Sequence, residues 1–237
     1  MLAILEYLDG SIRGLNISEI SRRLMIPKSS AHVIVLTLER LGYVRKDAGE
    51  RNYSLGMKAY ALGQKMVRTL SVSELALPHM RRLVDRLQLS AHLAVLDKDQ
   101  GMFIQKIENP GLIKFDTYIG KRMDLHCTGV GKVILAFESP KAVKHVFTKP
   151  VYMRYTKNTI TSPRELSKEI QEIQKLGYAL DDEEEEMGVR CVAVPVTDRL
   201  GKFVASLSVT GTIGQVSTDR IEFIASILKE TAATLSF

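Results

Sequence analysis

Apolar residues in the first 42 positions recur at the spacing of three short helices. The runs lie near residues 2–8, 17–24 and 31–41, and glycine, asparagine or proline residues separate them. Ser29 and Ser30 precede the third run, and their small side chains permit close approach to a phosphate backbone. Two short helices joined by a tight turn predict a helix-turn-helix whose second helix enters the major groove of DNA.

A basic hairpin follows the third run. Residues 43–45 alternate as a strand, residues 46–50 form a turn, and residues 51–55 return as a second strand. A hairpin directly behind a recognition helix is a wing, so the pattern favours a winged helix-turn-helix. The alternative is a small helical cap that packs on the rest of the chain.

The remainder of the chain mixes helical and strand patterns. Apolar spacing from Met57 predicts a helix that links the two parts, and a second helix reaches about Leu87. Ser162 or Pro163 begins a later helix, which Gly177 ends. An antiparallel sheet flanked by helices is an α+β arrangement. Strands are expected at 92–96, 102–107, 113–118, 178–180, 189–197 and 203–210, and a last helix at 217–235.

Charge is distributed unevenly between the two parts. The 237-residue chain has a formal net charge of +6; residues 1–90 contain 14 Lys and Arg against 8 Asp and Glu, whereas residues 91–237 contain 19 of each. The excess positive charge therefore lies in the first part, which favours its contact with a polyanion. A solvated basic surface is the alternative explanation.

Targeting signals are not visible in the sequence. No run approaches the roughly 18 apolar residues of a membrane span. Glu6 and Asp9 stand where a signal peptide carries positive charge. We therefore expect a cytoplasmic protein with no membrane partner.

Two segments of the second part indicate a ligand site. Residues 127–132 form a glycine-containing turn before an apolar helix, and free N–H groups at such a helix start suit a carboxylate. The spacing is not that of a phosphate-binding loop, which argues against nucleotide hydrolysis. Ser206, Ser208 and Thr210 share one face of a strand, so their hydroxyls are placed to bind an oxygen-rich ligand. The alternative is the solvent face of an edge strand.

Thiol chemistry is a weaker hypothesis. An enzyme would use Cys127 or Cys191 as nucleophile with His126, His92 or His145 as base, but no catalytic signature surrounds either cysteine. A zinc site at His126, Cys127 and Cys191 lacks the paired close spacing of structural zinc. We therefore expect no enzyme, no metal and no cofactor.

The acidic run at residues 181–186 has two interpretations. Six consecutive carboxylates predict a solvated, self-repelling loop in preference to a metal site. Asp181 alone is expected to reach the ligand pocket.

Several segments together resemble the IclR family of transcriptional regulators. The resemblance spans nearly the whole chain in the expected order, which is more specific than any single helix-turn-helix. The segments are SEISRRLMIPKSSAHVIVLTLERLGYVRKD, NYSLGMKAYALG, LHCTGVGKVILAF, GYALDDEEEEMGVRCVAVPVTD and ASLSVTG.

The resemblance implies a fold and a function. It implies a winged helix-turn-helix over residues 1–56, a linker helix over 57–71 and a GAF-like effector-binding domain over 72–237. Such a protein is a ligand-responsive bacterial regulator that binds double-stranded DNA at a near-palindromic operator as a homodimer or tetramer. A small organic acid modulates its affinity for the operator.

The resemblance also assigns site residues. Members often carry Arg where this chain has Val33, whose methyl groups suit a thymine methyl instead, and Thr210 stands where many members have Ser. The expected DNA contacts are Lys28, Ser29, Ser30, His32, Val33, Thr37, Arg40, Arg45, Lys46 and Arg51. The expected effector contacts are Gly129, Val130, Asp181, Cys191, Ser208 and Thr210.

Overall fold

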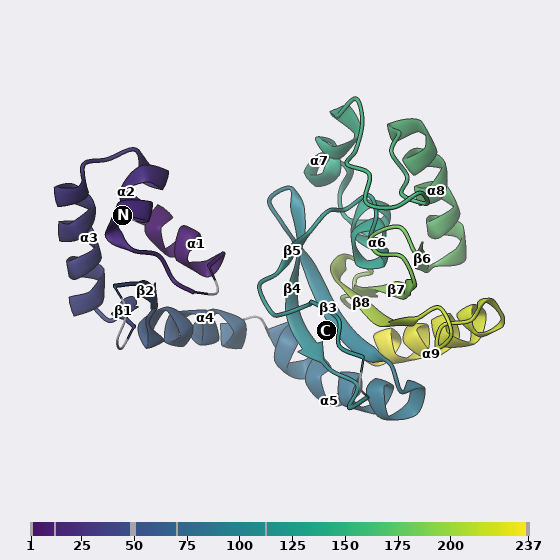
Figure 1. Ribbon diagram of the computed structural model, residues 1–237. Coiled ribbons are helices and arrows are strands. Elements are labelled where there is room, and N and C mark those ends of the chain that lie inside the picture. Colours follow the sequence, from purple (N-terminus) through teal and green to yellow (C-terminus); the bar gives the residue numbers. More distant parts are fainter. Residues whose placement is uncertain (1, 12, 48–50, 70, 112, 236–237) are drawn as a thin grey trace. The chain divides into compact units, whose positions relative to one another are not determined.

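The chain divides into two compact units, residues 1–69 and 70–237 (Figure 1). Each unit has its own hydrophobic core. The computed structural model describes residues 2–11, 13–47, 51–69, 71–111 and 113–235, without the side chains of 64–71.

The first unit consists of helices and a short hairpin. Asn16 caps α2, because its side chain accepts from the Glu19 N–H at 3.0 Å while the Glu19 carboxylate accepts from the Asn16 N–H at 2.9 Å. Met25 takes the left-handed conformation that ends α2, and Pro27 precedes α3. The elements are α1 (Ala3–Asp9), α2 (Ile17–Leu24), α3 (Lys28–Arg40), β1 (Val44–Lys46), β2 (Tyr53–Leu55) and α4 (Met57–Thr69).

The core of this unit explains the arrangement of its helices. Ile4 and Ile20 are fully buried against Val35 of α3, and Tyr53 of the hairpin joins the same cluster. Strands β1 and β2 pair antiparallel directly behind α3. The predicted winged helix-turn-helix is confirmed.

The second unit is built on one six-stranded antiparallel sheet of order β5-β4-β3-β8-β7-β6. Its helices are α5 (Ser71–Leu87), α6 (Gly129–Phe137), α7 (Pro140–Val143), α8 (Pro163–Leu176) and α9 (Ile221–Thr234), with 3-10 turns at Val146–Thr148 and Thr218–Arg220. Its strands are β3 (Ser90–Asp97), β4 (Gln100–Ile107), β5 (Arg122–Met123), β6 (Ala179–Asp182), β7 (Val189–Thr197) and β8 (Phe203–Thr212).

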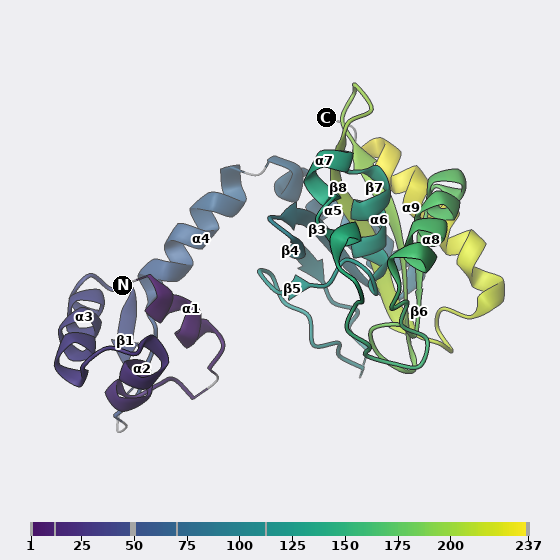
Figure 2. The same cartoon turned by 90° about the horizontal axis from the view of Figure 1, so that it is seen from above.

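Helices cover both faces of the sheet. Val192 and Val209 face a core formed with α5 and α9, whereas Ala193 faces a second core formed with α6 and α8. Figure 1 shows α5 and α9 along one side of the sheet and α6 and α8 on the other, and Figure 2 shows the same layers from above. The α+β prediction, with an antiparallel sheet flanked by helices, is confirmed.

One expectation about the strands is wrong, and one alternative is excluded. The segment 113–118 forms no strand; it crosses a polar face of the sheet, and β5 forms later instead. Strand β8 is not an edge strand, because it pairs with both β3 and β7 and buries Ser206 and Ser208. Local alternation does not reveal the position of a strand within its sheet.

The boundaries within the first 72 residues differ in detail from the expected ones. Helix α4 ends at Thr69 and α5 begins at Ser71, and the compact units divide after Thr69. The functional division into residues 1–56, 57–71 and 72–237 stays a prediction.

Candidate functional site

A cavity of about 240 Å³ lies in the second unit between the sheet, the start of α6 and two loops. Its lining residues come from widely separated parts of the sequence, so only the tertiary fold assembles them. They are Phe103, Phe115, Asp116, Thr117, Lys121, Thr128, Val130, Asp181, Glu185, Glu186, Val189, Cys191, Ser208 and Thr210.

The register of the sheet forms the floor of the cavity. Cys191 pairs with Asp181 on one side and with Thr210 on the other, so these three side chains share one row. Ser208 pairs with His92 in the next row on the same face. The Ser208 side chain is 1% exposed, and its hydroxyl has no hydrogen-bond partner in the described residues.

The start of α6 forms one wall. The Thr128 hydroxyl accepts from the Gly131 N–H at 3.1 Å and donates to the Asp124 carbonyl at 2.9 Å. A Cβ on Gly131 would lie 2.6 Å from the Leu125 Cα, so only glycine fits there. The N–H groups of Gly129 and Val130, in the first helical turn, bond to no group of the described chain.

Burial changes the acid–base properties of the floor. Burial raises the pKa of Asp181 to about 7, and the nearby Glu184 carboxylate adds to the shift. Burial also raises the pKa of the Cys191 thiol to about 12 and lowers the pKa of His92 to about 3. Around neutral pH Cys191 is therefore a thiol, the neighbouring His92 is a neutral imidazole, and the Asp181 carboxyl group is partly protonated.

A buried ion pair between Lys132 and Glu184 lies next to the residues that line the cavity. Lys132 of α6 is fully buried, and its ammonium contacts Glu184 and lies 3.1 Å from the Glu169 carboxylate of α8. The Glu184 N–H donates to the Asp181 carboxylate at 2.8 Å. The acidic run was expected to be a solvated loop, and at Glu184 that expectation is wrong, because Glu184 is buried against Lys132. Glu185 and Glu186 are exposed, but both border the cavity, so the expectation that Asp181 alone reaches it is also wrong.

The predicted effector residues lie together. Val130, Asp181, Cys191, Ser208 and Thr210 all line the cavity. Gly129 lies beside it, since a Cβ there would come 3.1 Å from the Cys191 sulfur. Sequence reasoning missed nine lining residues, and only Thr128, as a helix cap, carried a local signal. They are Phe103, Phe115, Asp116, Thr117, Lys121, Thr128, Glu185, Glu186 and Val189.

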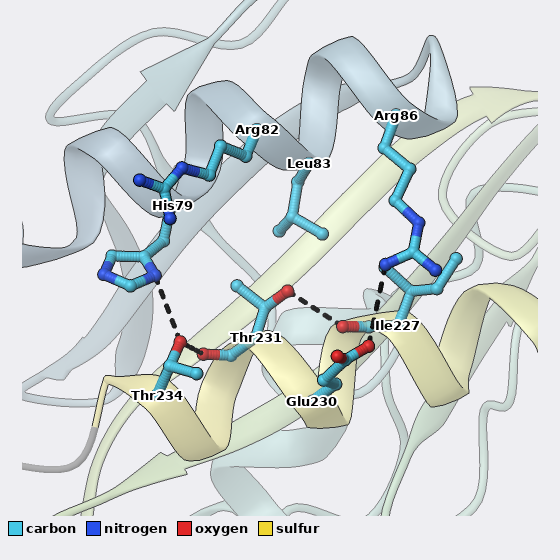
Figure 3. A pocket seen from close by; sticks show the side chains of 8 residues that line it. All are labelled: His79, Arg82, Leu83, Arg86, Ile227, Glu230, Thr231 and Thr234. Atoms are coloured by element: carbon cyan, nitrogen blue, oxygen red, sulfur yellow. Dashed lines mark hydrogen bonds and ion pairs between the residues drawn. The ribbon is translucent and has the colours of Figure 1, made fainter.

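Another hollow in this unit lies between α5 and α9 (Figure 3). It measures about 180 Å³, and Arg86 and Glu230 form an exposed ion pair of 3.6 Å at its edge. The Thr231 hydroxyl donates to the Ile227 carbonyl within its own helix. None of the predicted site residues borders this hollow, and its polar groups are largely satisfied by each other.

The recognition helix α3 presents a continuous outer face. Ala31 and Val35 face the core, whereas Ser29, Val33 and Arg40 are exposed on the opposite side. Val33 is 64% exposed in the middle of this row. Lys28, Ser30 and His32 are also exposed, and Thr37 is half-buried with its hydroxyl donating to the Val33 carbonyl at 2.8 Å.

The wing places its cations beside α2. Arg45, Lys46 and Arg51 are exposed, and the Arg45 guanidinium donates to the Ser54 hydroxyl at 3.0 Å. Lys46 and Arg51 border an open hollow of about 580 Å³ together with Arg22 and the first turn of α2. The structure thus groups basic side chains from two elements around a helix N-terminus.

Comparisons with known proteins agree with both units. Residues 1–48 match the family model of the IclR helix-turn-helix domain, and residues 64–237 match that of the C-terminal domain of the bacterial transcriptional regulator IclR. The chain belongs to the IclR family. It is therefore a transcriptional regulator with a DNA-binding helix-turn-helix domain and an IclR effector domain.

Individual IclR relatives cover the full chain. The HTH-type transcriptional regulator KdgR of Escherichia coli (strain K12) is 34% identical over 236 residues, which make up 100% of this chain and 89% of KdgR. The solved IclR of Thermotoga maritima is 32% identical with a TM-score of 0.80, covering 99% of this chain and 94% of that one.

An IclR homologue of Microbacterium hydrocarbonoxydans, solved in complex with 4-hydroxybenzoate, shares the fold. Its TM-score is 0.86 at 24% identity, over 99% of this chain and 97% of that one.

The cysteine-enzyme alternative finds no support among these IclR-family relatives. Burial raises the pKa of both Cys127 and Cys191, which disfavours the nucleophilic thiolate. Both cysteines are free thiols. Among the described residues, no three His, Cys, Asp or Glu side chains are placed to hold a metal ion. The described helices also include none with the length and apolar character to cross a membrane.

Replacing Asp181 with Asn is expected to stabilise the effector domain above pH 7 and to change little below pH 4. Because folding raises the pKa of Asp181 to about 7, the folded wild type binds this proton more tightly than the unfolded chain. Its unfolding free energy therefore falls as the pH rises from about 4 to 7. The variant should gain roughly 2–4 kcal/mol over wild type at pH 8.

Urea unfolding of both proteins between pH 3.5 and 8.5 measures this gain. Asp99→Asn is the control variant, because it makes the same substitution at an exposed side chain. A gain for Asp181→Asn that is the same at every pH would contradict the assignment.

Proposed function

We propose that this chain is a one-component regulator whose affinity for a near-palindromic operator changes when a small organic acid occupies the cavity of the effector domain. The observation that carries the proposal is the unpaired Ser208 hydroxyl, buried on the floor of that cavity. A buried hydroxyl without a partner costs about 1–3 kcal/mol, which a polar ligand recovers.

The acid binds with its carboxylate at the start of α6. The free N–H groups of Gly129 and Val130 and the positive end of the helix dipole favour an anion there. Asp181 on the opposite side takes up a proton and donates it in a hydrogen bond to the ligand. Ser208, Thr210 and the Cys191 thiol supply the remaining polar contacts.

DNA is contacted by α3 and the wing. Ser29, Ser30, His32, Val33 and Arg40 meet the major groove, with Lys28 at the helix start on a phosphate and Thr37 at the edge of the contact. Arg45, Lys46 and Arg51 of the wing neutralise phosphates. The methyl groups of Val33 contact a thymine methyl.

The protein acts as a homodimer or a pair of dimers, because a near-palindromic operator requires two copies of the winged helix-turn-helix domain. Met57, Tyr60 and Leu62 of α4 leave large apolar surfaces exposed, which a second copy would cover. The ligand favours one arrangement of the assembled chains, so it shifts operator affinity only by its different affinities for the two states. No catalytic step and no cofactor take part, and the protein acts in the cytoplasm.

Fluorescence anisotropy tests the proposal. The labelled duplex comes from the promoter region beside the protein's own gene, a shuffled duplex is the comparison, and both are titrated over a salt series with a panel of small carboxylates. We expect about 10³-fold tighter binding to the native duplex and a steep salt dependence. At least one acid should change the operator Kd tenfold or more.

A pair of serine variants distinguishes an effect on ligand binding in the cavity from an effect on folding. Ser208→Ala should weaken the acid's effect about tenfold, because it removes one hydrogen bond to the ligand. Ser206→Ala is the matched control, since Ser206 is also buried and unpaired but lies outside the cavity. Equal affinity for native and shuffled duplexes, or equal loss of response in both variants, would contradict the proposal.

A further inference from the structure

A second compartment adjoins the effector cavity. It measures about 270 Å³ and lies beyond Phe115 and Thr210, which border both compartments. Asn109, Gly111, Ile113 and Phe115 border it on one side, and the ends of β3 and β8 form its base. The full lining is Ser90, Asn109, Gly111, Ile113, Phe115, Thr210 and Gln215.

Hydrogen bonds from the sheet hold the backbone around Phe115, which borders both compartments. The Lys106 ammonium donates to the Thr117 carbonyl and lies 3.5 Å from the Phe115 carbonyl. The His92 imidazole and the Thr117 hydroxyl share a hydrogen bond of 2.9 Å. The backbone beside Phe115 is therefore anchored, and the Phe115 side chain borders both spaces.

The second compartment offers two hydrogen-bond donors. The Gln215 side-chain carbonyl accepts from the Thr212 N–H at 3.0 Å, which orients its amide, and its NH₂ group donates to no described residue. The Ser90 hydroxyl accepts from the Asn109 N–H at 3.1 Å, while its own proton has no acceptor in the described chain. Two free donors at this end fit an acceptor oxygen.

Size and charge narrow the ligand. Each compartment alone is below the roughly 300 Å³ at which ligand pockets begin, whereas both together enter that range. Among the described residues that line the first compartment, Lys121 is the one cation, against the acidic residues Asp116, Asp181, Glu185 and Glu186. A ligand with a second carboxylate is disfavoured there, while hydroxyl groups donate to these carboxylates.

We infer that the effector is an elongated hydroxylated monocarboxylic acid that spans both compartments. Its carboxylate lies at the start of α6, its chain passes Phe115, and an oxygen at its far end accepts from Ser90 and Gln215. This inference rests on the proposed function for its carboxylate end, and it adds Phe115, Ser90 and Gln215 as the residues that select ligand length.

Calorimetric binding to the full chain tests ligand length. The probes are straight-chain hydroxy monocarboxylates of two to eight carbons, with one hydroxyl on each carbon beyond the carboxyl group, and the matching alcohols and polyols without the carboxylate. Affinity should rise at least tenfold between the two-carbon and six-carbon acids, as the second compartment fills. Equal affinity along the series, or binding by no member of either series, overturns the inference.

Three variants locate the effect. Gln215→Leu together with Ser90→Ala should weaken the six-carbon acid at least tenfold and leave the two-carbon acid unchanged. Phe115→Trp narrows the space between the compartments and leaves both donors in place. It should also lower the affinity for the long acids but not for the short ones. Ser208→Ala is the reference, because it should weaken acids of every length. Equal losses for short and long acids in the first two variants overturn the inference.

The binding results distinguish a failure of the proposed function from a failure of the spanning-ligand inference. If polyols bind with a dependence on Gln215 while acids do not bind, the second compartment is established and the carboxylate end of the proposed function is wrong. If short acids alone bind and respond to Ser208→Ala, the proposed function stands and the spanning ligand is wrong.

Discussion

Replacing Lys132 with Met is expected to lower the unfolding free energy of the effector domain by about 3–5 kcal/mol. The ammonium contacts the buried Glu184 carboxylate, and one oxygen of that carboxylate already lacks a hydrogen-bond partner. Without the cation, Glu184 is left as an uncompensated buried charge beside Asp181. The expected loss of stability comes more from the unpaired Glu184 carboxylate than from the lost Lys132 side chain.

Urea unfolding followed by circular dichroism measures this loss. Lys175→Met is the matched control, because Lys175 pairs with Glu172 at 2.7 Å with both side chains largely exposed, and exposed pairs contribute up to about 1 kcal/mol. The double variant Lys132→Met/Glu184→Leu should recover most of the stability. A Lys132→Met protein no less stable than Lys175→Met would contradict the role of the pair.

The Lys132 pair also bears on sensing. Glu184 precedes Glu185 and Glu186, which line the cavity, and Lys132 lies three residues after Gly129, where we propose that the ligand carboxylate binds. The ion pair therefore holds the acidic loop and the start of α6 in one geometry. A Lys132→Met protein that still folds should bind the effector more weakly for that reason.

Replacing Val33 with Glu is expected to weaken operator binding about 100-fold while leaving stability within 0.5 kcal/mol. Val33 lies at the centre of the exposed face of α3, so the new carboxylate would meet the DNA phosphates and bases. A like charge at an interface costs several kcal/mol, and 100-fold corresponds to about 2.7 kcal/mol. Because the side chain is exposed, the core of the first unit is untouched.

Anisotropy titration and thermal unfolding check both halves of this prediction. Val151→Glu is the matched control, since Val151 is 63% exposed against 64% for Val33 but belongs to the effector domain. It should bind the operator like wild type. Val33→Ala should relax the preference at one base pair only, by about 1–3 kcal/mol. Similar losses for the Val33 and Val151 glutamate variants would place the DNA surface elsewhere.

Local signals determined the elements and much of the chemistry. These signals involve only residues that are close together in the sequence. They are the helix caps at Asn16 and Ser162, the left-handed conformation of Gly177 and the alternating side chains of β8. Short-range hydrogen bonds and side-chain periodicity depend on adjacent residues, so a single sequence reveals them. The charge difference between the two parts is likewise a property of sequence alone.

Tertiary structure decided what the cavity contains. Segment 113–118 has the composition of a strand, but its place over a polar sheet face makes it a wall of the cavity. The acidic run reads as solvated until Lys132, 52 residues away from Glu184, is found buried against it. Burial and pairing depend on contacts between distant segments, which periodicity does not encode, so the sequence predicted the elements of this protein and the fold alone decided which side chains meet in its cavity.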